Sequence, residues 1–341
     1  MLKKQTILQI RNVYTAHAFQ SGSDFYVGAG SETESMVQLF NLAAQTAEKL
    51  ENCPGGMMSF IPVPGQPGFY VTIMGLFPPF LGKEAGLYLH KKTGNGWRTS
   101  KVLDLPFAHR CEFLPHPGRT ILVAATVSKF KENPADWSKP GEIHAISLTG
   151  ALSGQWESEL IDSSITRNHG MSRTMIDGVE RLCVSGQEGI LAIGLIPGES
   201  WEVTSLFGKE VSEFSFLDLD GDGKSELITI EPFHGNTLNV YKQIEGDWKL
   251  KFSDPLFFGH GLSSGMFNGT PVVVAGNRSD SLALETFTVS DLDKGIVNRI
   301  VIEKDCGPTQ TQVFSLGATD YILSANQRKH EVALYSGPMG D

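Results

Sequence analysis

The chain has 341 residues, of which 40% are hydrophobic and 19% charged, so it is long enough to bury a core and too apolar for disorder. Its net charge of −10 argues against nucleic acid or an anionic membrane as partners. No apolar run reaches 18 residues, and the N-terminal MLKKQTILQIRN lacks the apolar core of a secretory signal. Cys53, Cys111, Cys183 and Cys306 form no CxxC pair, which predicts buried thiols in a cytoplasmic protein.

Short β-rich runs follow one another along the chain, each bounded by turn residues. They are FYVGAG, GFYVTIMG, TILVAATV, ERLCVSG, SELITIE, TPVVVAG and DYILSAN, starting near residues 25, 68, 120, 180, 225, 270 and 320. Only residues 34–50 could form a longer helix, and MVQLFNL within them also reads as a strand. A repeat of roughly 40 to 60 residues is typical of propeller blades, each made of four short strands.

We therefore expect an all-β fold, a seven-bladed β-propeller of four-stranded antiparallel blades, as a single domain over residues 1–341. Six or eight blades, or a β-sandwich with accidental regularity, are the alternatives. An N-terminal strand over residues 5–13 could complete the last blade. The expected blades cover residues 10–50, 52–104, 105–160, 164–205, 209–254, 256–302 and 305–340.

The turn in the fifth unit is acidic and reads DLDGDGKSE. Alternating carboxylates and a closing glutamate suit a hard, oxygen-ligated cation, most simply Ca²⁺. The expected ligands are Asp218, Asp220, Asp222 and Glu226. The loop resembles those of FG-GAP/VCBS-repeat β-propellers, which carry D-x-D-G-D-G between the first two strands of a blade. That resemblance implies one structural calcium site, because the other units lack the acids.

Histidines recur where the first strands of the units begin. They are His17, His109, His169 and His260, with Gln310 at the same place in the last unit. If the first strands line a central channel, these side chains form a ring at one end. Imidazole and amide oxygen are ligands for Mn, Zn or Fe, so we expect a divalent transition metal on His109, His169, His260 and Gln310. The alternative is that they line a water-filled tunnel and bond to the backbone.

Loops between second and third strands should lie at the same end as this ring. They carry Lys129, Trp137, Arg278, Arg328 and His330, which we expect to bind substrate. Aromatic rings beside cations suit a sugar that carries a carboxylate, because the ring stacks on the sugar and Arg grips the anion.

The ring of His and Gln resembles that of sugar-active propellers, namely oligogalacturonide lyases, aldos-2-ulose dehydratases and rhamnose–glucuronate lyases. The resemblance implies a metal-dependent carbohydrate lyase, dehydratase or isomerase that removes a proton next to a carbonyl or carboxylate. His17 would be the base, while Arg110 and Arg173 would neutralise the enolate. A small carbohydrate would be the substrate, and the protein a monomer or weak homo-oligomer.

Two other functions stay open at this point. The first is a non-catalytic propeller that binds a glycan or a protein, with the calcium loop as a structural element. The second is a hydrolase that uses a pair of carboxylates, against which stands the shortage of acids near the ring, where Glu112 and Glu213 are the only ones.

Overall fold

Burial along the chain follows the place of each strand in its sheet. The second strand of a sheet is an apolar run buried on both faces, as in β23 (Thr270–Asn277), where TPVVVAGN is buried from Val272 onward. The outermost strand is much less buried, as in β25 (Ile296–Glu303), where every residue is exposed or half-buried. Covered central strands read as continuous Val, Ile and Leu runs, whereas edge strands keep one wet face.

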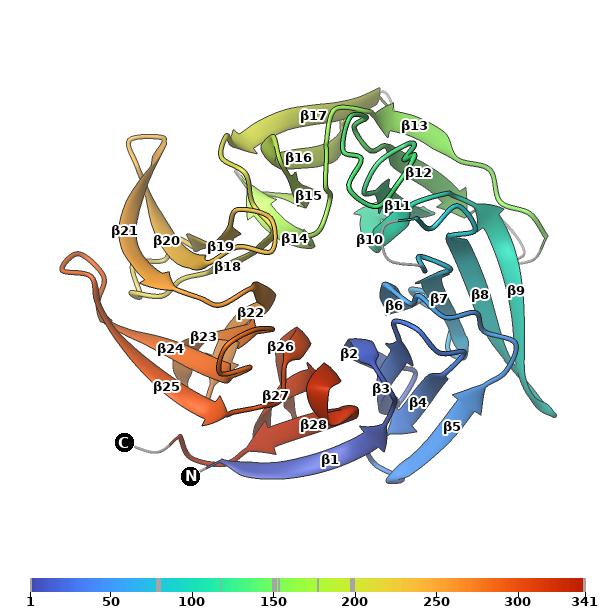
Figure 1. The fold of residues 1–341 in the computed structure, drawn as a ribbon, viewed down its shortest axis with the longest axis horizontal. Coiled ribbons are helices and arrows are strands. Elements are labelled where there is room, and N and C mark those ends of the chain that lie inside the picture. The colour runs from blue at the N-terminus through green and yellow to red at the C-terminus, as the bar shows by residue number, and fades with distance from the viewer. Residues whose placement is uncertain are drawn as a thin grey trace. The chain divides into compact units, whose positions relative to one another are not determined.

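The structure is a computed structural model that describes residues 2–77, 81–116, 118–148, 152, 154–176, 178–196 and 200–339. Its described residues contain 28 strands in seven four-stranded antiparallel sheets, and one 3-10 turn, η1 (Gln327–Lys329) (Figure 1). The expected all-β, seven-bladed propeller is therefore confirmed. None of the helical segments described has the length and apolarity needed to cross a membrane.

Packing divides the chain into two compact units, and the first comprises Met1–Ala18 with Ser212–Asp341. It contains three sheets that begin with β18, β22 and β26. Their strands are β18 (Glu213–Leu217), β19 (Glu226–Glu231), β20 (Thr237–Ile244) and β21 (Asp247–Pro255); β22 (Gly259–Phe267), β23, β24 (Leu284–Asp291) and β25; and β26 (Pro308–Leu316), β27 (Thr319–Asn326), β28 (Glu331–Ser336) and β1 (Lys3–Gln9).

The second unit covers Phe19–Val211, and its boundary falls within β2. The sheets here again follow chain order. Their strands are β2 (Val13–Ser21), β3 (Asp24–Ser31), β4 (Val37–Asn41) and β5 (Thr46–Leu50); β6 (Ser59–Pro62), β7 (Phe69–Met74), β8 (Gly86–Thr93) and β9 (Gly96–Asp104); β10 (Ala108–His116), β11 (Arg119–Thr126), β12 (Ile143–Leu148) and β13 (Glu159–Asp162); and β14 (Met171–Ile176), β15 (Val179–Gly186), β16 (Gly189–Ile196) and β17 (Ser200–Phe207).

Residues 34–50, which could have been helical, contain the hairpin β4–β5. Asn41 ends β4, and its Oδ1 accepts the backbone N–H groups of Ala43 and Ala44, both at 2.9 Å. An Asn that bonds to the backbone two and three residues later stabilises a turn instead of a continuing helix. The local side-chain bond thus decides between the two interpretations.

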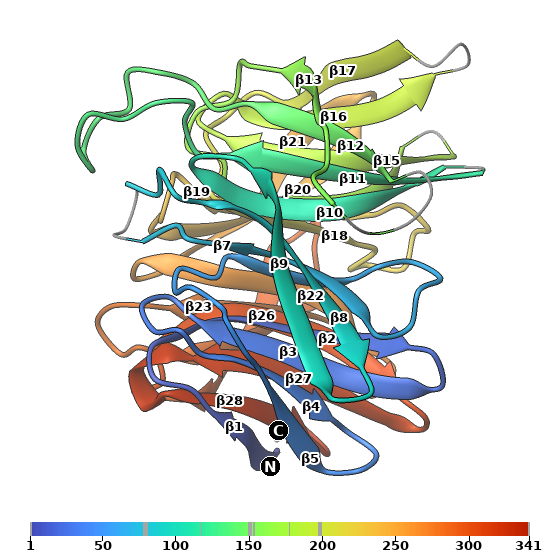
Figure 2. The same cartoon turned by 90° about the vertical axis from the view of Figure 1, so that its right-hand side faces the viewer.

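The N-terminal strand completes the last sheet, where β1 pairs with β28 in antiparallel register from Lys3↔Ser336 to Gln9↔Glu331. The two strands lie side by side in both views (Figures 1 and 2). Lys4 also contacts two carboxylates, Glu303 at 2.7 Å and Glu331. This sheet therefore joins the two ends of the chain by backbone bonds and by ion pairs.

Apolar side chains fill the space between neighbouring sheets within each unit. Between the sheets of β18–β21 and β22–β25, the buried cluster includes Ile228, Leu238, Val273 and Phe287. Between those of β10–β13 and β14–β17 it includes Val123 and Val184. These clusters hold the first strands in place, and the candidate site residues lie where those strands begin.

Candidate functional site

His260 is the best-positioned imidazole in the first unit. It is fully buried on β22, and its Nδ1 lies 2.6 Å from the carbonyl oxygen of Thr309. A carbonyl can only accept, so Nδ1 carries the proton and Nε2 keeps its lone pair. Nε2 lies 3.0 Å from the hydroxyl of Tyr14. Thr309 Oγ1 in turn donates to the carbonyl of Tyr14 at 2.8 Å. Thr309 therefore contacts both His260 and Tyr14.

His234, which is not one of the residues predicted for the ring, lies against His260. The two ring centroids are 5.2 Å apart with an interplanar angle of 28°, and their possible ligand nitrogens lie within 4.8 Å. His234 stands in the loop between β19 and β20 at φ +49°, and its backbone N–H donates to Ser212 Oγ at 3.1 Å. The sequence could have pointed to His234 through topology alone, because the loop between the second and third strands returns to the end of the sheet where the first strands begin.

A second pair of imidazoles lies in the second unit. His109 on β10 and His169, just before β14, are both buried, with ring centroids 4.8 Å apart. Asn168 beside them is fully buried, and its Oδ1 has no hydrogen-bond partner among the described residues. Arg110 donates to the carbonyls of His169 and Met58, both at 2.7 Å, so this predicted catalytic residue has a structural contact.

The predicted four-ligand metal site is divided between the units. His109 and His169 belong to one, and His260 and Gln310 to the other. Gln310 Oε1, expected to be a ligand, accepts the backbone N–H of Ala16 at 3.1 Å. The ring of His109, His169, His260 and Gln310 as a single ligand set therefore stays a prediction. His17, the expected base, is half-buried on β2.

Two other predicted site residues have partners that do not suggest substrate. Arg173 on β14 is exposed and pairs with Glu180 at 3.3 Å on the neighbouring strand. Trp137 packs between cations, with Lys131 Nζ 3.1 Å from its ring centroid and Arg167 at 5.2 Å. Burial outweighs the attraction of Asp136 and lowers the pKa of Lys131 to about 8. These contacts make Trp137 an anchor for its own loop.

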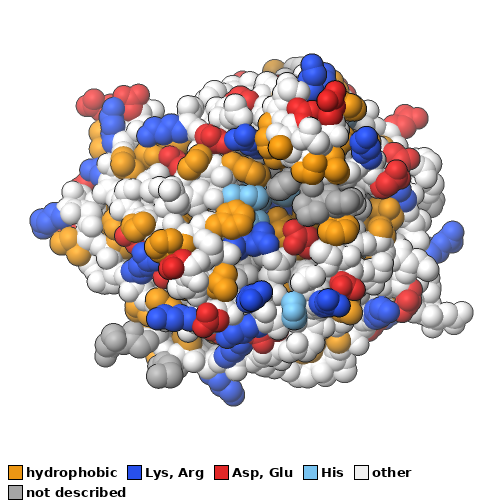
Figure 3. All heavy atoms as spheres, in the orientation of Figure 1, with side chains coloured by type: hydrophobic (Ala, Val, Ile, Leu, Met, Phe, Trp, Pro, Cys, Tyr) orange, Lys and Arg blue, Asp and Glu red, His pale blue; other side chains and the backbone are white. Residues whose placement is uncertain are grey.

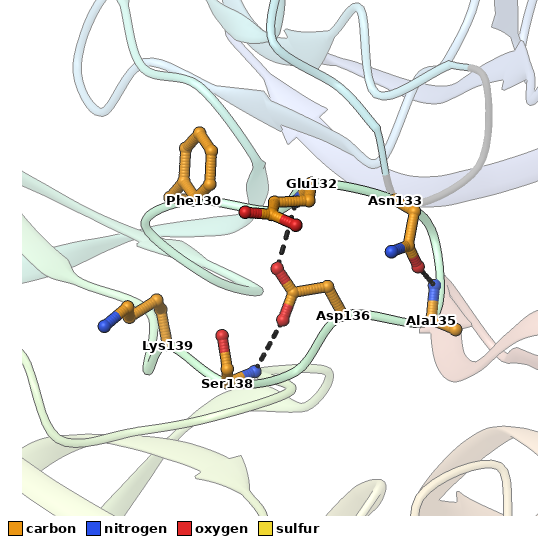
Figure 4. Close-up of a pocket in the computed structure, with 7 residues that line it drawn as sticks. All are labelled: Phe130, Glu132, Asn133, Ala135, Asp136, Ser138 and Lys139. Atoms are coloured by element: carbon orange, nitrogen blue, oxygen red, sulfur yellow. Dashed lines mark hydrogen bonds between the residues drawn. The ribbon is translucent and has the colours of Figure 1, made fainter.

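That loop forms an open pocket of about 500 Å³, lined by Phe130, Glu132, Asn133, Ala135, Asp136, Ser138 and Lys139 (Figure 4). Asp136 organises it by accepting the backbone N–H groups of Glu132 at 3.0 Å and Ser138 at 2.9 Å. These bonds lower the pKa of Asp136 to about 2. Lys129 is exposed at the base of the loop, where its backbone N–H bonds to Pro140.

The remaining three predicted substrate residues come together. Arg278, Arg328 and His330 line one pocket of about 280 Å³ in the first unit, together with Asn12, Phe258, Leu282, Gly307 and Gln327. Phe258 also packs on His234 at 4.8 Å, and the Arg278 guanidinium lies 5.8 Å from the Tyr14 ring. The pocket thus adjoins the His234–His260 pair. On the face drawn in Figure 3, His side chains reach the surface beside Lys and Arg.

The acidic loop lies between β18 and β19. The carboxylates of Asp218, Asp220 and Asp222 lie within 4.8 Å of one another. Asp218 accepts the N–H groups of Gly221 at 2.7 Å and Gly223 at 2.9 Å, and both glycines have positive φ, which a side chain would disfavour. The turn is therefore held in shape by its own backbone bonds.

A lysine shares this loop, which the sequence did not reveal. Lys242 on β20 contacts Asp220 and lies 3.0 Å from Asp222. Glu226 is fully buried, and its Oε1 has no hydrogen-bond partner in the described part of the chain. Burial, helped by the charges of Asp220 and Asp222, raises the pKa of Glu226 to about 7. A cation is already present at the carboxylates of Asp220 and Asp222. Glu226 Oε2 accepts the backbone N–H of Leu219 at 2.8 Å, which leaves Oε1 as its buried oxygen without a partner in the described part of the chain.

Comparisons with known proteins support the fold. The chain matches no family model and none of the curated proteins. Among solved structures it is similar to the β-propeller domain of Cps50 (Swd1) from Myceliophteria thermophila, with 9% identity, a TM-score of 0.59, and coverage of 98% of this chain and 100% of that one. Sqt1 from Saccharomyces cerevisiae is similar at 9% identity, with a TM-score of 0.60 and coverage of 96% of this chain and 84% of that one.

A putative 6-phosphogluconolactonase from Bacteroides uniformis matches equally well, with 12% identity, a TM-score of 0.59, and coverage of 96% and 91%. The chain has the propeller fold. At such low identity these likenesses establish the architecture alone, because one fold carries many unrelated functions.

Proposed function

We propose that the protein is a metal-dependent carbohydrate lyase, dehydratase or isomerase that removes a proton next to a carbonyl or carboxylate of a uronate or keto-sugar. The observation that carries the proposal is the bonding of His260. Its Nδ1–H is fixed on a backbone carbonyl, its Nε2 lies 3.0 Å from the Tyr14 hydroxyl, and a nitrogen of His234 lies within 4.8 Å of one of its own. Metal-binding histidines usually donate their other N–H in this way.

The donor set fits a borderline divalent cation such as Mn, Zn or Fe. Two donors bound to one ion at about 2.1 Å each lie roughly 3 to 3.5 Å apart. Tyr14 Oη and His260 Nε2 are 3.0 Å apart, and a nitrogen of His234 lies within 4.8 Å of His260. When bound, the ion would polarise a substrate carbonyl or carboxylate as a Lewis acid.

The chain's own groups have separate roles in this proposal. Thr309 holds His260 in one tautomer, and the Tyr14 hydroxyl, which lies on Nε2 in this structure, would release that nitrogen and become an oxygen donor when an ion binds. Arg278 places positive charge beside the pocket, where it can neutralise an enolate. His17, half-buried on β2, is the proposed base, because an imidazole nitrogen can accept a proton from the substrate. The roles predicted for Arg110 and Arg173 are not needed.

Metal analysis of the purified protein tests the proposal. We expect about one transition metal per chain, reduced several-fold in His260→Ala and His234→Ala. His144→Ala is the matched control, because His144 bonds to Glu142 and Ser158 on an outer part of its sheet. Uronate oligosaccharides should yield unsaturated products that absorb ultraviolet light, and EDTA should stop the reaction. If no transition metal is found and no substrate turns over with added metal, the proposal fails.

A non-catalytic propeller that binds a glycan or a protein is the second candidate. It is favoured by Gln310 and Arg110, which bond to backbone groups as tunnel-lining residues would. Glycan-array binding without turnover, unaffected by EDTA, would select it.

We also propose that the loop of Asp218, Asp220, Asp222 and Glu226 binds Ca²⁺ in a structural role. Support comes from the cluster of carboxylates and from the buried, unmatched oxygen of Glu226. The ammonium of Lys242 must leave when the ion binds, so affinity should be modest.

A further inference from the structure

The pocket beside His260 is lined by cationic side chains, although the protein as a whole is negatively charged. Three of its eight described lining residues are basic or imidazole side chains, Arg278, Arg328 and His330, and that lining contains no carboxylate. The whole chain carries a net charge of −10. A cationic concavity in an anionic protein concentrates anions locally and would not arise from average composition.

Three contacts that orient the Arg278 side chain are with neutral groups. Its guanidinium donates to the amide oxygen of Gln327 and lies over the rings of Phe258 and Tyr14, at 5.5 and 5.8 Å. Such contacts orient the planar fork without cancelling its charge. A pre-oriented guanidinium loses little entropy when it grips an oxyanion with two parallel bonds.

Arg328 supplies a second guanidinium. It belongs to η1 and is exposed, and its side chain makes no ion pair or hydrogen bond with any residue that the structure describes. Its backbone N–H bonds to the carbonyl of Cys306 at 3.0 Å, which fixes where the side chain starts. The Arg328 guanidinium therefore lines the pocket without being paired to a carboxylate in the described part of the chain.

His330 completes the set as a hydrogen-bond donor. Its Nδ1 accepts the backbone N–H of Asn12 at 3.0 Å, so in the neutral ring the proton is on Nε2. The residue closes η1 at φ +57°, with its own N–H on Gln327 at 3.1 Å. Its carbonyl accepts the N–H of Ile10 at 2.8 Å. These bonds hold the imidazole at a fixed position in the lining.

We propose that this pocket binds the carboxylate or phosphate group of a small organic acid, most simply a sugar acid or sugar phosphate. Its volume of about 280 Å³ lies just below the usual range for small-molecule sites. Phe258 and Leu282 provide an apolar wall for the carbon skeleton. As the recognition part of the substrate site, the assignment rests on the proposed function, whereas anion binding can be tested without it.

Calorimetric titration of the full chain, stripped of metal with EDTA and dialysed, tests the pocket. The probes are glucuronate for a carboxylate, glucose 6-phosphate for a phosphate, and glucose as the neutral control. We expect one or both anions to bind and glucose not to bind. Binding should weaken as salt rises, because the contacts are ionic. The anion that binds more tightly identifies the headgroup.

Two variants locate the binding. Arg328→Gln should weaken it about tenfold, and Arg278→Lys, which keeps the charge but loses the fork, should weaken it by a similar factor. Arg98→Gln makes the same charge change at an exposed position on β9 and should have no effect. Circular dichroism confirms that each variant is folded.

The outcomes separate the pocket from the reaction. Binding of an anion that depends on Arg278 and Arg328, without turnover on any metal, supports the pocket and counts against the proposed function. If neither anion binds the metal-free protein at millimolar concentration, or if both pocket variants bind as wild type does, the pocket assignment is wrong.

Discussion

Lys242 determines how the acidic loop responds to cations. Its ammonium contacts Asp220 and Asp222, and the hydrogen bonds that it donates to those carboxylates raise its pKa. A divalent ion must displace the Lys242 ammonium. Because this ammonium is tethered to the adjacent strand, it competes with the ion at a high local concentration. The loop can thus keep its shape without an ion and still accept one.

Removing this lysine should change the calcium response. In Lys242→Met we expect a lower melting temperature than wild type without Ca²⁺, because three carboxylates then repel one another, and a larger upward shift when Ca²⁺ is added. Ligand at a hundred times its dissociation constant stabilises by about 2.7 kcal/mol. Thermal unfolding with and without Ca²⁺ measures both effects.

Lys49→Met provides the comparison, since Lys49 is on β5, in a different sheet, and pairs with Glu51 at 4.0 Å. The melting temperature of this variant should rise with Ca²⁺ by the same amount as that of the wild type. A Lys242→Met protein that gains nothing from Ca²⁺ would contradict the proposed calcium site.

Among the elements, β1 holds the chain's two ends in one sheet, and polar contacts add to its backbone bonds. Lys4 contacts Glu303 and Glu331, Thr6 donates to Glu331 at 2.7 Å, and Asn326 donates to Glu331 at 3.1 Å. Burial alone would raise the pKa of Glu303, but hydrogen bonds from Lys329, Lys4 and Tyr335 outweigh it and lower the pKa. The same balance lowers that of Glu331.

Lys4→Met should therefore destabilise the protein by about 2 kcal/mol at pH 7, because the buried carboxylate of Glu331 and the half-buried one of Glu303 lose a charged donor. The folded-state pKa values of Glu303 and Glu331 lie below their ordinary values, so this stabilisation is present above about pH 4.5 and is lost as the pH falls through the folded values. Urea unfolding at pH 7 and at pH 3 measures it.

The difference between wild type and Lys4→Met should shrink at the lower pH. Lys3→Met serves as the control, because Lys3 is exposed on the same strand. A difference that stays constant with pH, or that also appears in Lys3→Met, would show that the strand contributes through packing alone.

For the molecule as a whole, the sequence predicted the architecture because it is periodic. Each sheet repeats the same order of an apolar central run and a turn, as in β22–β23, where Asn268 and Gly269 both have positive φ. Such a two-residue turn matches the twist of a hairpin. The pattern survives without detectable family sequence similarity because it follows from burial and turn geometry.

The site was less predictable, and three residues show why. His234 lies outside the first strands, so a search for equivalent strand positions passes over it. Gln310 is at such a position, but its amide oxygen bonds to the backbone of Ala16 on a neighbouring strand. Lys242 reaches Asp220 because of strand register, which adjacent sequence does not encode. Spacing predicts which residues share an end of the fold, but not which atoms satisfy one another.

The most direct test of the central claim is anomalous diffraction from crystals grown with Mn²⁺ or Zn²⁺, collected on both sides of the metal's absorption edge. The account predicts an edge-dependent peak about 2.1 Å from Nε2 of His260, with Nδ1 still bonded to the carbonyl of Thr309. A map with full metal in the mother liquor and no such peak at His260 would contradict it.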